Sequence, residues 1–319
     1  MTPKEKIDYL VETFDINRIY ARTLASRLGN PLTSEAEIFK VMAEKAKPFV
    51  KWVGGKRQLL RQFRDLGLYP PEDFDPLFNT YYEPFVGGGA VFFDLLPNKA
   101  ELSDLNYELV ITYNIIKKNV GALIKSLKKH KYDKEYYLKI RAQNTKKLSD
   151  LEIASRFIYL NRTGFNGMYR VNSHGEFNVP FGKYTNPIIC DEENLHRASK
   201  ALQKVTVKQR DYKNVLKKAK KGDFVYFDPP YYPVSKTASF TSYTAESFLE
   251  NEQTELRDTF VELHKRGCFV MLSNSDTPFI NKIYSRIPGV KISKVEACRA
   301  INSKGSKRGK ITEVLVTNY

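Results

Sequence analysis

The sequence predicts an α/β fold in which an open sheet carries its functional groups at the carboxyl ends of its strands. Phe224–Phe227 is rich in aromatic and β-branched residues, which is typical of a short buried strand. The prolines of Asp228-Pro229-Pro230-Tyr231 prevent this strand from continuing. Residues 81–93 predict another strand, then a glycine turn and an amphipathic helix, as in a nucleotide-binding βαβ unit. Ligands bind beyond the strand ends in such sheets, so we expect a site there.

Residues 1–46 are expected to form a helical extension before this sheet. Ile7, Leu10 and Val11 keep helical spacing, and Ser34 with Glu37 has the spacing of a capping box. Short helices of this kind could form a helix-turn-helix-like DNA-binding unit. We favour a cap packed on the main domain, because helical hairpins are common and their length carries no DNA signal.

The segment Lys51-Trp52-Val53-Gly54-Gly55-Lys56-Arg57 is a glycine loop but not a phosphate-binding P-loop. Val50 stands where that motif needs a glycine, and Arg57 stands where it needs Ser or Thr. The segment also contains the only tryptophan of the chain.

The glycine turn at residues 87–89 would let the backbone approach a ligand closely. Asp104 ends the next predicted strand, Glu101–Asp104, where a carboxylate can bind ribose hydroxyls. The three consecutive glycines do not match the dinucleotide fingerprint GxGxxG. The pattern therefore favours an adenosine ligand without a pyrophosphate, and S-adenosyl-L-methionine fits this description.

The middle of the chain is basic. Residues 121–150 contain many lysines that either form a solvated helix face or follow phosphates. Residues 161–184 predict a long hairpin that turns at Ser173-His174-Gly175, and a two-stranded ribbon can enter a DNA major groove. Residues 200–221 predict a second basic helical stretch.

Two more strands are predicted after Asp228. Cys268–Asp276 contains a buried strand that ends in polar residues, and Ile311–Val316 forms a final strand. The loop before the final strand contains Arg299, Lys304, Lys307, Arg308 and Lys310 without an acid, so it is either a linker or a phosphate clamp.

Composition favours a nucleic-acid partner. The 319-residue, 36.8 kDa chain has a formal net charge of +16 and 42% hydrophobic residues, which predicts a packed protein with a polyanionic partner. A lysine-rich solvated surface is the alternative. The cysteines, Cys190, Cys268 and Cys298, lack metal-ligand spacing and are expected to be reduced. With no signal peptide or long apolar run visible, we expect a cytoplasmic, DNA-associated protein with no metal and no membrane contact.

The tetrapeptide at 228–231 suits a planar substrate that carries an amine. The carboxylate of Asp228 and the carbonyl of Pro229 can accept the two amine hydrogens, while the ring of Tyr231 stacks on the substrate face. A nucleobase has this chemistry. The alternative is that Asp-Pro-Pro is an ordinary turn after a strand.

From about Lys47 to Tyr319, the chain resembles Dam-type DNA adenine-N6 methyltransferases, of the kind found in restriction–modification systems. The motifs that carry the resemblance occur in the family's order: Lys51–Lys56, Glu83–Gly89, Leu102-Ser103-Asp104, the hairpin, Asp228–Tyr231 and Ser306–Lys310. Residues 1–46 lie outside the match.

The resemblance implies a Rossmann-like S-adenosylmethionine-dependent methyltransferase domain, formed by residues 47–122 and 205–319. A DNA target-recognition region, residues 123–204, would interrupt it. The positions that match the family's cofactor-binding residues are Trp52, Lys56, Glu83, Phe85, Gly87, Gly89, Asp104, Asp211 and Asp228.

The resemblance also implies base flipping of an adenine within GATC in double-stranded DNA. Asp228, Pro229, Pro230 and Tyr231 would be the catalytic residues, and Arg170 would read a guanine. The positions that match the family's DNA contacts are Arg162, Phe165, Asn166, Met168, Arg170, Pro180 and Tyr184.

Several alternatives stay open at this point. A related fold could methylate cytosine N4, RNA or a protein glutamine, or the chain could be a DNA-binding regulator without catalysis. A cytosine-C5 enzyme would need a nucleophilic cysteine, and no Pro-Cys pair occurs in the chain. A restriction endonuclease acting on the same site is a further possible partner, and the sequence leaves the oligomeric state open.

Overall fold

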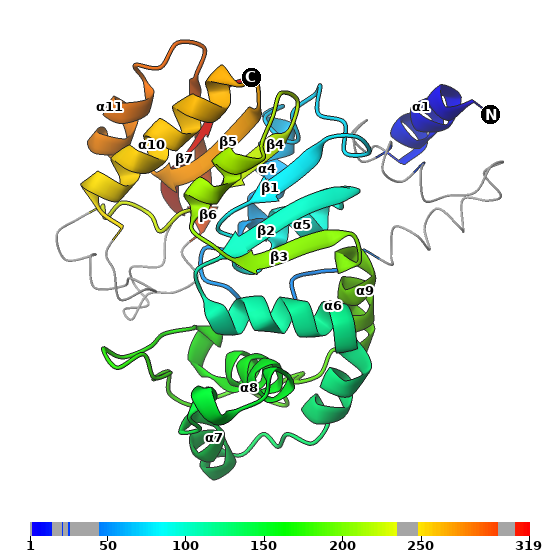
Figure 1. The fold of residues 1–319 in the computed structure, drawn as a ribbon, viewed down its shortest axis with the longest axis vertical. Coiled ribbons are helices and arrows are strands. Elements are labelled where there is room, and N and C mark those ends of the chain that lie inside the picture. The colour runs from blue at the N-terminus through cyan, green and yellow to red at the C-terminus, as the bar shows by residue number, and fades with distance from the viewer. Residues whose placement is uncertain (1, 15–20, 22–24, 26–44, 235–247, 299–309) are drawn as a thin grey trace.

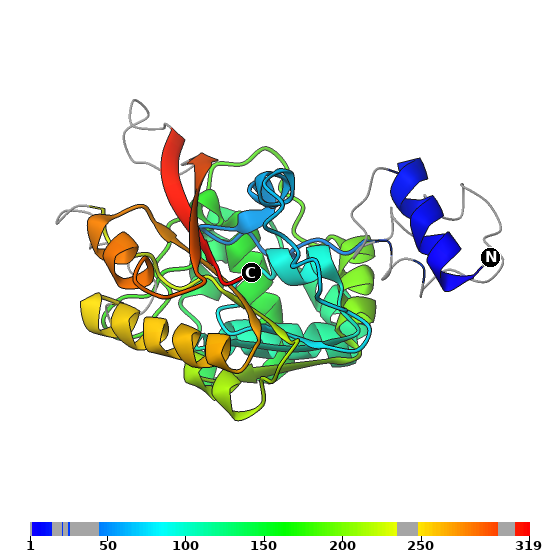
Figure 2. The same cartoon turned by 90° about the horizontal axis from the view of Figure 1, so that it is seen from above.

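The computed structural model describes residues 2–14, 21, 25, 45–234, 248–298 and 310–319. The other helices expected before residue 46, most of the basic loop before the final strand, and the Ser306–Gly309 part of the family motif lie outside the described residues. Within the extension, α1 spans Pro3–Phe14 and lies apart from the sheet and its helices, which differs from the packing we favoured (Figures 1 and 2).

The described residues form a seven-stranded sheet with the order β3-β2-β1-β4-β5-β7-β6 (Figure 1). The first five strands in this order are parallel, whereas β7 is antiparallel to both β5 and β6. The strand bounds are β1 Thr80–Glu83, β2 Lys99–Asp104, β3 Val205–Gln209, β4 Phe224–Phe227, β5 Phe269–Ser275, β6 Lys291–Cys298 and β7 Lys310–Thr317. The predicted α/β fold with a Rossmann-like parallel sheet is confirmed.

Helices cover both faces of this sheet, because successive side chains of its buried strands point to opposite faces. In β4, Phe224 and Tyr226 belong to one core cluster, and Val225 and Phe227 belong to the other. The helices that contribute to the first cluster are α4 Leu60–Asp65, α5 Ala90–Leu95, α6 Tyr107–Leu127, α8 Asp150–Thr163 and α9 Glu192–Leu202. The second includes residues of η4 Tyr212–Lys217, α10 Glu250–Lys265 and α11 Pro278–Tyr284.

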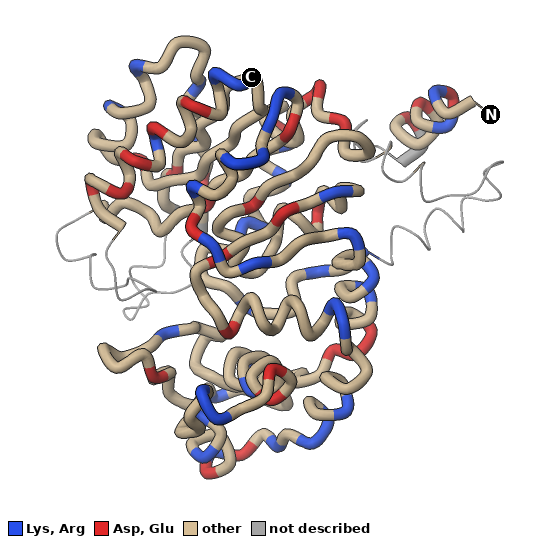
Figure 3. Tube along the Cα trace, viewed as in Figure 1, with Lys and Arg blue, Asp and Glu red and all other residues tan. Residues whose placement is uncertain are grey.

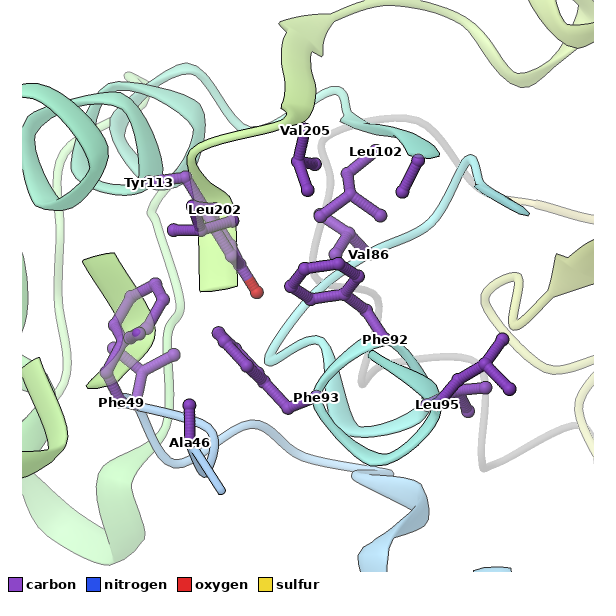
Figure 4. Packing of buried hydrophobic residues seen from close by; sticks show 14 of the residues in the cluster. Ala46, Phe49, Val86, Phe92, Phe93, Leu95, Leu102, Tyr113, Leu202 and Val205 are labelled. Carbon is purple, nitrogen blue, oxygen red and sulfur yellow. The ribbon is translucent and has the colours of Figure 1, made fainter. Parts of the chain in front are cut away.

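The first cluster connects the sheet to the middle of the chain. Figure 4 shows Phe92 and Phe93 of α5 facing Tyr113 of α6, with Leu202 and Val205 close by. The helix α6 also packs against α8 and α9, and α7 (Lys134–Arg141) packs on α8. The region between β2 and β3 is therefore a helical layer attached to the β3 edge of the sheet (Figure 1).

Two sequence predictions need correction. The stretch 200–221 is not one helix, because α9 ends at Leu202 and the alternating Val205-Thr206-Val207 forms edge strand β3 on β2. In addition, residues 161–163 are the last turn of α8 and not part of a hairpin. The rest of the predicted hairpin, residues 164–184, is an irregular ribbon. It has only the isolated bridges Gly164↔Phe181 and Val171↔Phe177. Its turn does lie at residues 173–175, where the Gly175 amide donates to the Asn172 carbonyl at 2.9 Å.

Candidate active site

The predicted polar groups meet at the carboxyl ends of neighbouring strands of the sheet. Glu83 ends β1, Asp104 ends β2 and Asp228 follows β4 directly. Since β2, β1 and β4 are neighbouring parallel strands, their carboxyl ends lie side by side. The topology therefore gathers three acids that are far apart in the sequence.

The carboxylate of Asp228 is paired with Lys56, which lies at the start of the short helix η1 (Lys56–Gln58). The Lys56 ammonium lies 2.7 Å from one carboxylate oxygen of Asp228 and 2.8 Å from the other, and it also donates to the Gly54 carbonyl. Burial raises the pKa of Asp228 to about 6, although the positive charge of Lys56 opposes this shift. The acid is therefore ionised at neutral pH and protonated in mild acid.

A buried amide network holds the backbone after Asp228. The side chain of Gln253 donates to the Pro230 carbonyl at 2.9 Å and accepts from Asn274 at 2.9 Å. Asn274 in turn accepts from the Tyr232 amide at 3.1 Å. Gln253 and Asn274 are both fully buried. These bonds fix residues 230–232, while no donor among the described residues reaches the carbonyl of Pro229.

The ring of Tyr231 is held at its far end. Its phenol donates to the carboxylate of Glu313 in β7 at 2.7 Å, and the Lys56 ammonium lies 5.0 Å from the ring centroid. Burial raises the pKa of Tyr231, so the phenol stays protonated and remains a donor.

The glycine turn is built tightly around Trp52. The Gly87 amide donates to Asp104 at 3.1 Å, and its carbonyl accepts from the Tyr113 phenol at 3.1 Å. Gly87 has a φ of +45°, and a Cβ there would lie 2.5 Å from the Trp52 indole nitrogen. Gly89 also has a positive φ, and a Cβ there would lie 2.6 Å from the Tyr113 oxygen. Neither glycine can be replaced without moving an aromatic ring.

The other predicted cofactor residues have different surroundings. Glu83 is buried and accepts from the Tyr81 phenol at 2.9 Å and the Phe92 amide at 3.1 Å, and burial raises its pKa to about 8. Phe85 stacks on Tyr212 with ring centroids 5.4 Å apart. Asp211 is exposed and caps η4.

The predicted DNA contacts fall into two groups. Phe165, Asn166, Arg170 and Pro180 are exposed, and the Arg170 guanidinium donates to the Asn178 side chain at 2.7 Å. Arg162, Met168 and Tyr184 are instead partly buried.

The partly buried group points into the protein rather than away from it. Arg162 donates to the Phe49 carbonyl at 2.8 Å, and Met168 packs on the small core cluster that includes Phe177. Tyr184 donates to the Gly164 carbonyl at 3.0 Å and carries the Lys51 ammonium 4.2 Å from its ring centroid. These side chains support the ribbon on the side that faces the rest of the protein.

Sequence reasoning missed residues that organise the site. Glu313 and Gln253 contact the tetrapeptide from distant parts of the chain, without a local motif. Asn161 is a third example: its buried side chain accepts from the Lys51 amide and donates to the carbonyls of Lys51 and Gly167, all at 2.8 Å. Its position next to Arg162 in a polar stretch was the available signal.

Neither the distribution of charged residues nor the search for metal ligands among the described residues helps to locate the site. Figure 3 shows Lys and Arg spread over the sheet and the middle region, interleaved with acids, so charge alone marks no single surface. No group of His, Cys, Asp or Glu in the described part of the chain could hold a metal ion. Likewise, none of the described helices is long and apolar enough to span a membrane.

Comparisons with known proteins agree on one family. A family model described as D12 class N6 adenine-specific DNA methyltransferase matches residues 52–301. A type II methyltransferase of Lactococcus lactis subsp. cremoris is 46% identical over 281 residues, which cover 86% of this chain and 95% of that protein. A type II methyltransferase of Methanocaldococcus jannaschii is 43% identical, covering 86% and 99%. The DNA adenine methylase of Escherichia coli K12 is 35% identical, covering 85% and 95%.

Proposed function

Because the chain belongs to the D12 class of N6 adenine-specific DNA methyltransferases, we propose that it methylates the adenine of GATC sites in double-stranded DNA, with S-adenosyl-L-methionine as methyl donor. The observation that carries this proposal is the arrangement after β4. A partly buried carboxylate, a carbonyl that no donor among the described residues reaches, and an aromatic ring fixed at its phenol oxygen converge there, as an exocyclic amine on a flat base requires.

Adenine must leave the duplex before it can reach Asp228. Extrusion costs a few kcal/mol, and stacking on the ring of Tyr231 would return about 1–3 kcal/mol, the value typical of base–aromatic contacts. The Asp228 carboxylate and the Pro229 carbonyl would each accept one amine hydrogen. These bonds favour a pyramidal nitrogen, whose lone pair is then available for attack.

The bound cofactor supplies an electrophilic methyl group on a sulfonium sulfur. As the nitrogen–carbon bond formed, the sulfur–carbon bond would break and leave the neutral thioether S-adenosylhomocysteine, and the proton released by the amine would pass through the Asp228 carboxylate to solvent. The protein contributes position and electrostatics rather than a covalent intermediate. The Lys56 ammonium contacts both oxygens of Asp228, and each oxygen keeps a further lone pair that can accept from the amine.

The residues around the glycine turn fit the adenosine part of this cofactor. The carboxylate of Asp104 is only partly buried and can accept hydroxyl donors beyond the two backbone amides it already binds. Because the Trp52 indole lies so close to Gly87, the turn has no room for a side chain at that position. We assign cofactor contacts to Trp52, Lys56, Phe85, Gly87, Gly89, Asp104, Asp211 and Asp228, and a supporting role to the fully buried Glu83.

We assign DNA reading to residues 123–204 and catalysis to residues 47–122 and 205–319. In the ribbon, Arg170 is suited to a bidentate contact with guanine, and Phe165 with Asn166 can occupy the space left by the extruded base. The partly buried Arg162, Met168 and Tyr184 support these exposed residues, together with Pro180, whose carbonyl accepts from the Phe165 amide at 2.9 Å. Such an enzyme would act in the cytoplasm, and a restriction endonuclease of the same specificity would be its natural counterpart.

Transfer of labelled methyl groups tests this proposal. The purified protein and labelled S-adenosyl-L-methionine are incubated with duplexes that contain GATC or the same bases in scrambled order, and the products are digested to nucleosides. We expect label in N6-methyladenine with GATC alone. Label on another sequence would overturn the GATC assignment, label on cytosine would overturn the adenine assignment, and tight DNA binding without label would identify a regulator.

A further inference from the structure

One buried acid at the site has no place in the proposed chemistry. Glu313 lies in β7 beside the buried residues Val314, Leu315 and Val316, and only 8% of its surface is exposed. An ionised carboxylate at such a position is costly unless it is hydrogen-bonded. Its carboxylate accepts from the phenol of Tyr231 at 2.7 Å.

This hydrogen bond restrains the orientation of the Tyr231 ring, which the bonds to the neighbouring backbone leave free. Gln253 and Asn274 fix the main chain on either side of the ring, at Pro230 and Tyr232. They do not fix the rotation of the ring, because the terminal torsion of an aromatic side chain has a broad preference. The Glu313 carboxylate anchors the far end of the ring, on the oxygen.

The strand that carries Glu313 is itself held on both sides. Glu313 is opposite Ser275 of β5 and Val295 of β6 in the sheet register. A side chain that starts from this central position is more rigidly placed than one on a loop.

We propose that Glu313 is a positioning residue for methyl transfer, which holds the Tyr231 ring in the orientation that stacks on the extruded adenine. This inference rests on the proposed role of Tyr231 and adds the residue that orients it. Glu313 does not touch the base. It acts through the phenol, so its removal leaves the methyl donor and the surface that reads DNA in place.

Variants of the bond separate positioning from a merely structural role. Tyr231→Phe keeps the ring but removes the donor, Glu313→Leu removes the acceptor, and Glu313→Gln keeps an acceptor oxygen. Glu296→Gln is the matched control, because Glu296 is an exposed glutamate on the neighbouring strand β6. For each variant, kcat and KM are measured for GATC duplex and for S-adenosyl-L-methionine, together with the thermal unfolding midpoint.

We expect Tyr231→Phe and Glu313→Leu each to lower kcat about tenfold, the size of one lost buried hydrogen bond. KM for S-adenosyl-L-methionine should be unchanged, and Glu313→Gln should retain most of the parent rate. The double variant should be no slower than either single variant, since both remove the same bond.

A fluorescent base reports the stacking itself. With 2-aminopurine in place of the target adenine, the parent should quench the extruded base on the Tyr231 ring, and Tyr231→Phe and Glu313→Leu should bind the duplex with higher fluorescence. Glu313→Gln and Glu296→Gln should resemble the parent.

The same set of variants shows which idea fails. If Tyr231→Ala loses transfer while Tyr231→Phe and Glu313→Leu keep the parent kcat, the positioning role is overturned and the proposed function stands. Full transfer by Tyr231→Ala would overturn both. Additive losses in the double variant, or a loss in Glu313→Gln as large as in Glu313→Leu, would also contradict positioning through this hydrogen bond.

Discussion

The loop that carries the tetrapeptide and the ribbon assigned to DNA reading are held in opposite ways. Residues 228–232 are bonded by side chains from four separate elements, η1, α10, β5 and β7: Lys56, Gln253, Asn274 and Glu313. The tip of the ribbon is bonded mainly to itself, as in the pair Arg170 and Asn178. Reaction chemistry demands a preorganised centre, whereas a reading surface must adapt to a partner.

The base of the ribbon is intermediate between these two cases. The Tyr132 phenol donates to the Gly182 carbonyl and accepts from the Tyr184 amide, both at 2.7 Å. Asn161 joins the ribbon to Lys51, next to Trp52. The ribbon can therefore change at its tip while its entry point stays in register with the site.

The strongest test of the comparison removes the acid of the rigid loop. We expect Asp228→Ala to lower methyl transfer by at least about 10²- to 10³-fold, the cost of removing one preorganised partner at a reacting group, with GATC binding unchanged. Because this variant leaves the Lys56 ammonium unpaired, Asp228→Asn serves as a variant of similar shape. Single-turnover rates and gel-shift affinities measure the two effects.

Asp258→Ala is the control, since Asp258 is an exposed carboxylate on α10. Transfer by Asp228→Asn at the parent rate would show that the site has been placed wrongly.

A second test loosens the rigid loop without touching the reacting groups. Gln253→Leu leaves the Pro230 carbonyl and the Asn274 amide without their partner. The loss of a buried partner costs about 1–3 kcal/mol, so we expect kcat to fall about tenfold to a hundredfold. Thr254→Ala, the next position on α10, is the control. An unchanged kcat in Gln253→Leu would mean that the network does not serve the chemistry.

The third test changes Arg170 in the ribbon, the more adaptable of the two regions. A bidentate arginine–guanine contact contributes about 1–3 kcal/mol of discrimination. Arg170→Ala should therefore lose about that much preference for GATC over a duplex with a substituted guanine, while kcat on saturating GATC changes less. Arg61→Ala removes an arginine whose side chain is 90% exposed, on α4, and is the control. If Arg170→Ala discriminates as well as the parent does, the ribbon reads that base with another residue.

The smallest effect concerns pH. Burial raises the pKa of Asp228 to about 6, so the ionised form that accepts from the amine is present above that pH and is lost below it. We expect kcat/KM for GATC duplex to fall about tenfold for each pH unit below about 6. The profile is measured from pH 5 to 8 at constant ionic strength, with DNA affinity as control. A flat profile across this range would exclude Asp228 as the titrating acceptor.

Local sequence was sufficient where a single segment determines its own structure. The strand Phe224–Phe227 and the prolines after it place Asp228 at a strand end without help from the rest of the chain. The stretch 200–221 was wrongly predicted to be helical throughout, because the lysines around the short edge strand β3 hide the alternation of its apolar and polar residues. The ribbon was overextended to residue 161 because α8 ends only at Thr163, where the chain turns to pair with Phe181.

The supporting residues of the site could not be inferred in this way. Glu313 is 82 positions from Tyr231, and Gln253 is 23 positions from Pro230. Each is one of several polar residues in its strand or helix, and its role depends on the sheet order that places β7 beside β5. Such partners become visible only once the strands are assembled.

The order of the sheet also has an evolutionary consequence. The region that we assign to DNA reading, residues 123–204, lies between β2 and β3 in the chain, whereas Asp228, Gln253, Asn274 and Glu313 all follow it. A lineage can therefore exchange or reshape the inserted part without rebuilding the reaction centre. If the proposed assignment holds, such an insertion would allow a new target sequence to be acquired while the chemistry is kept.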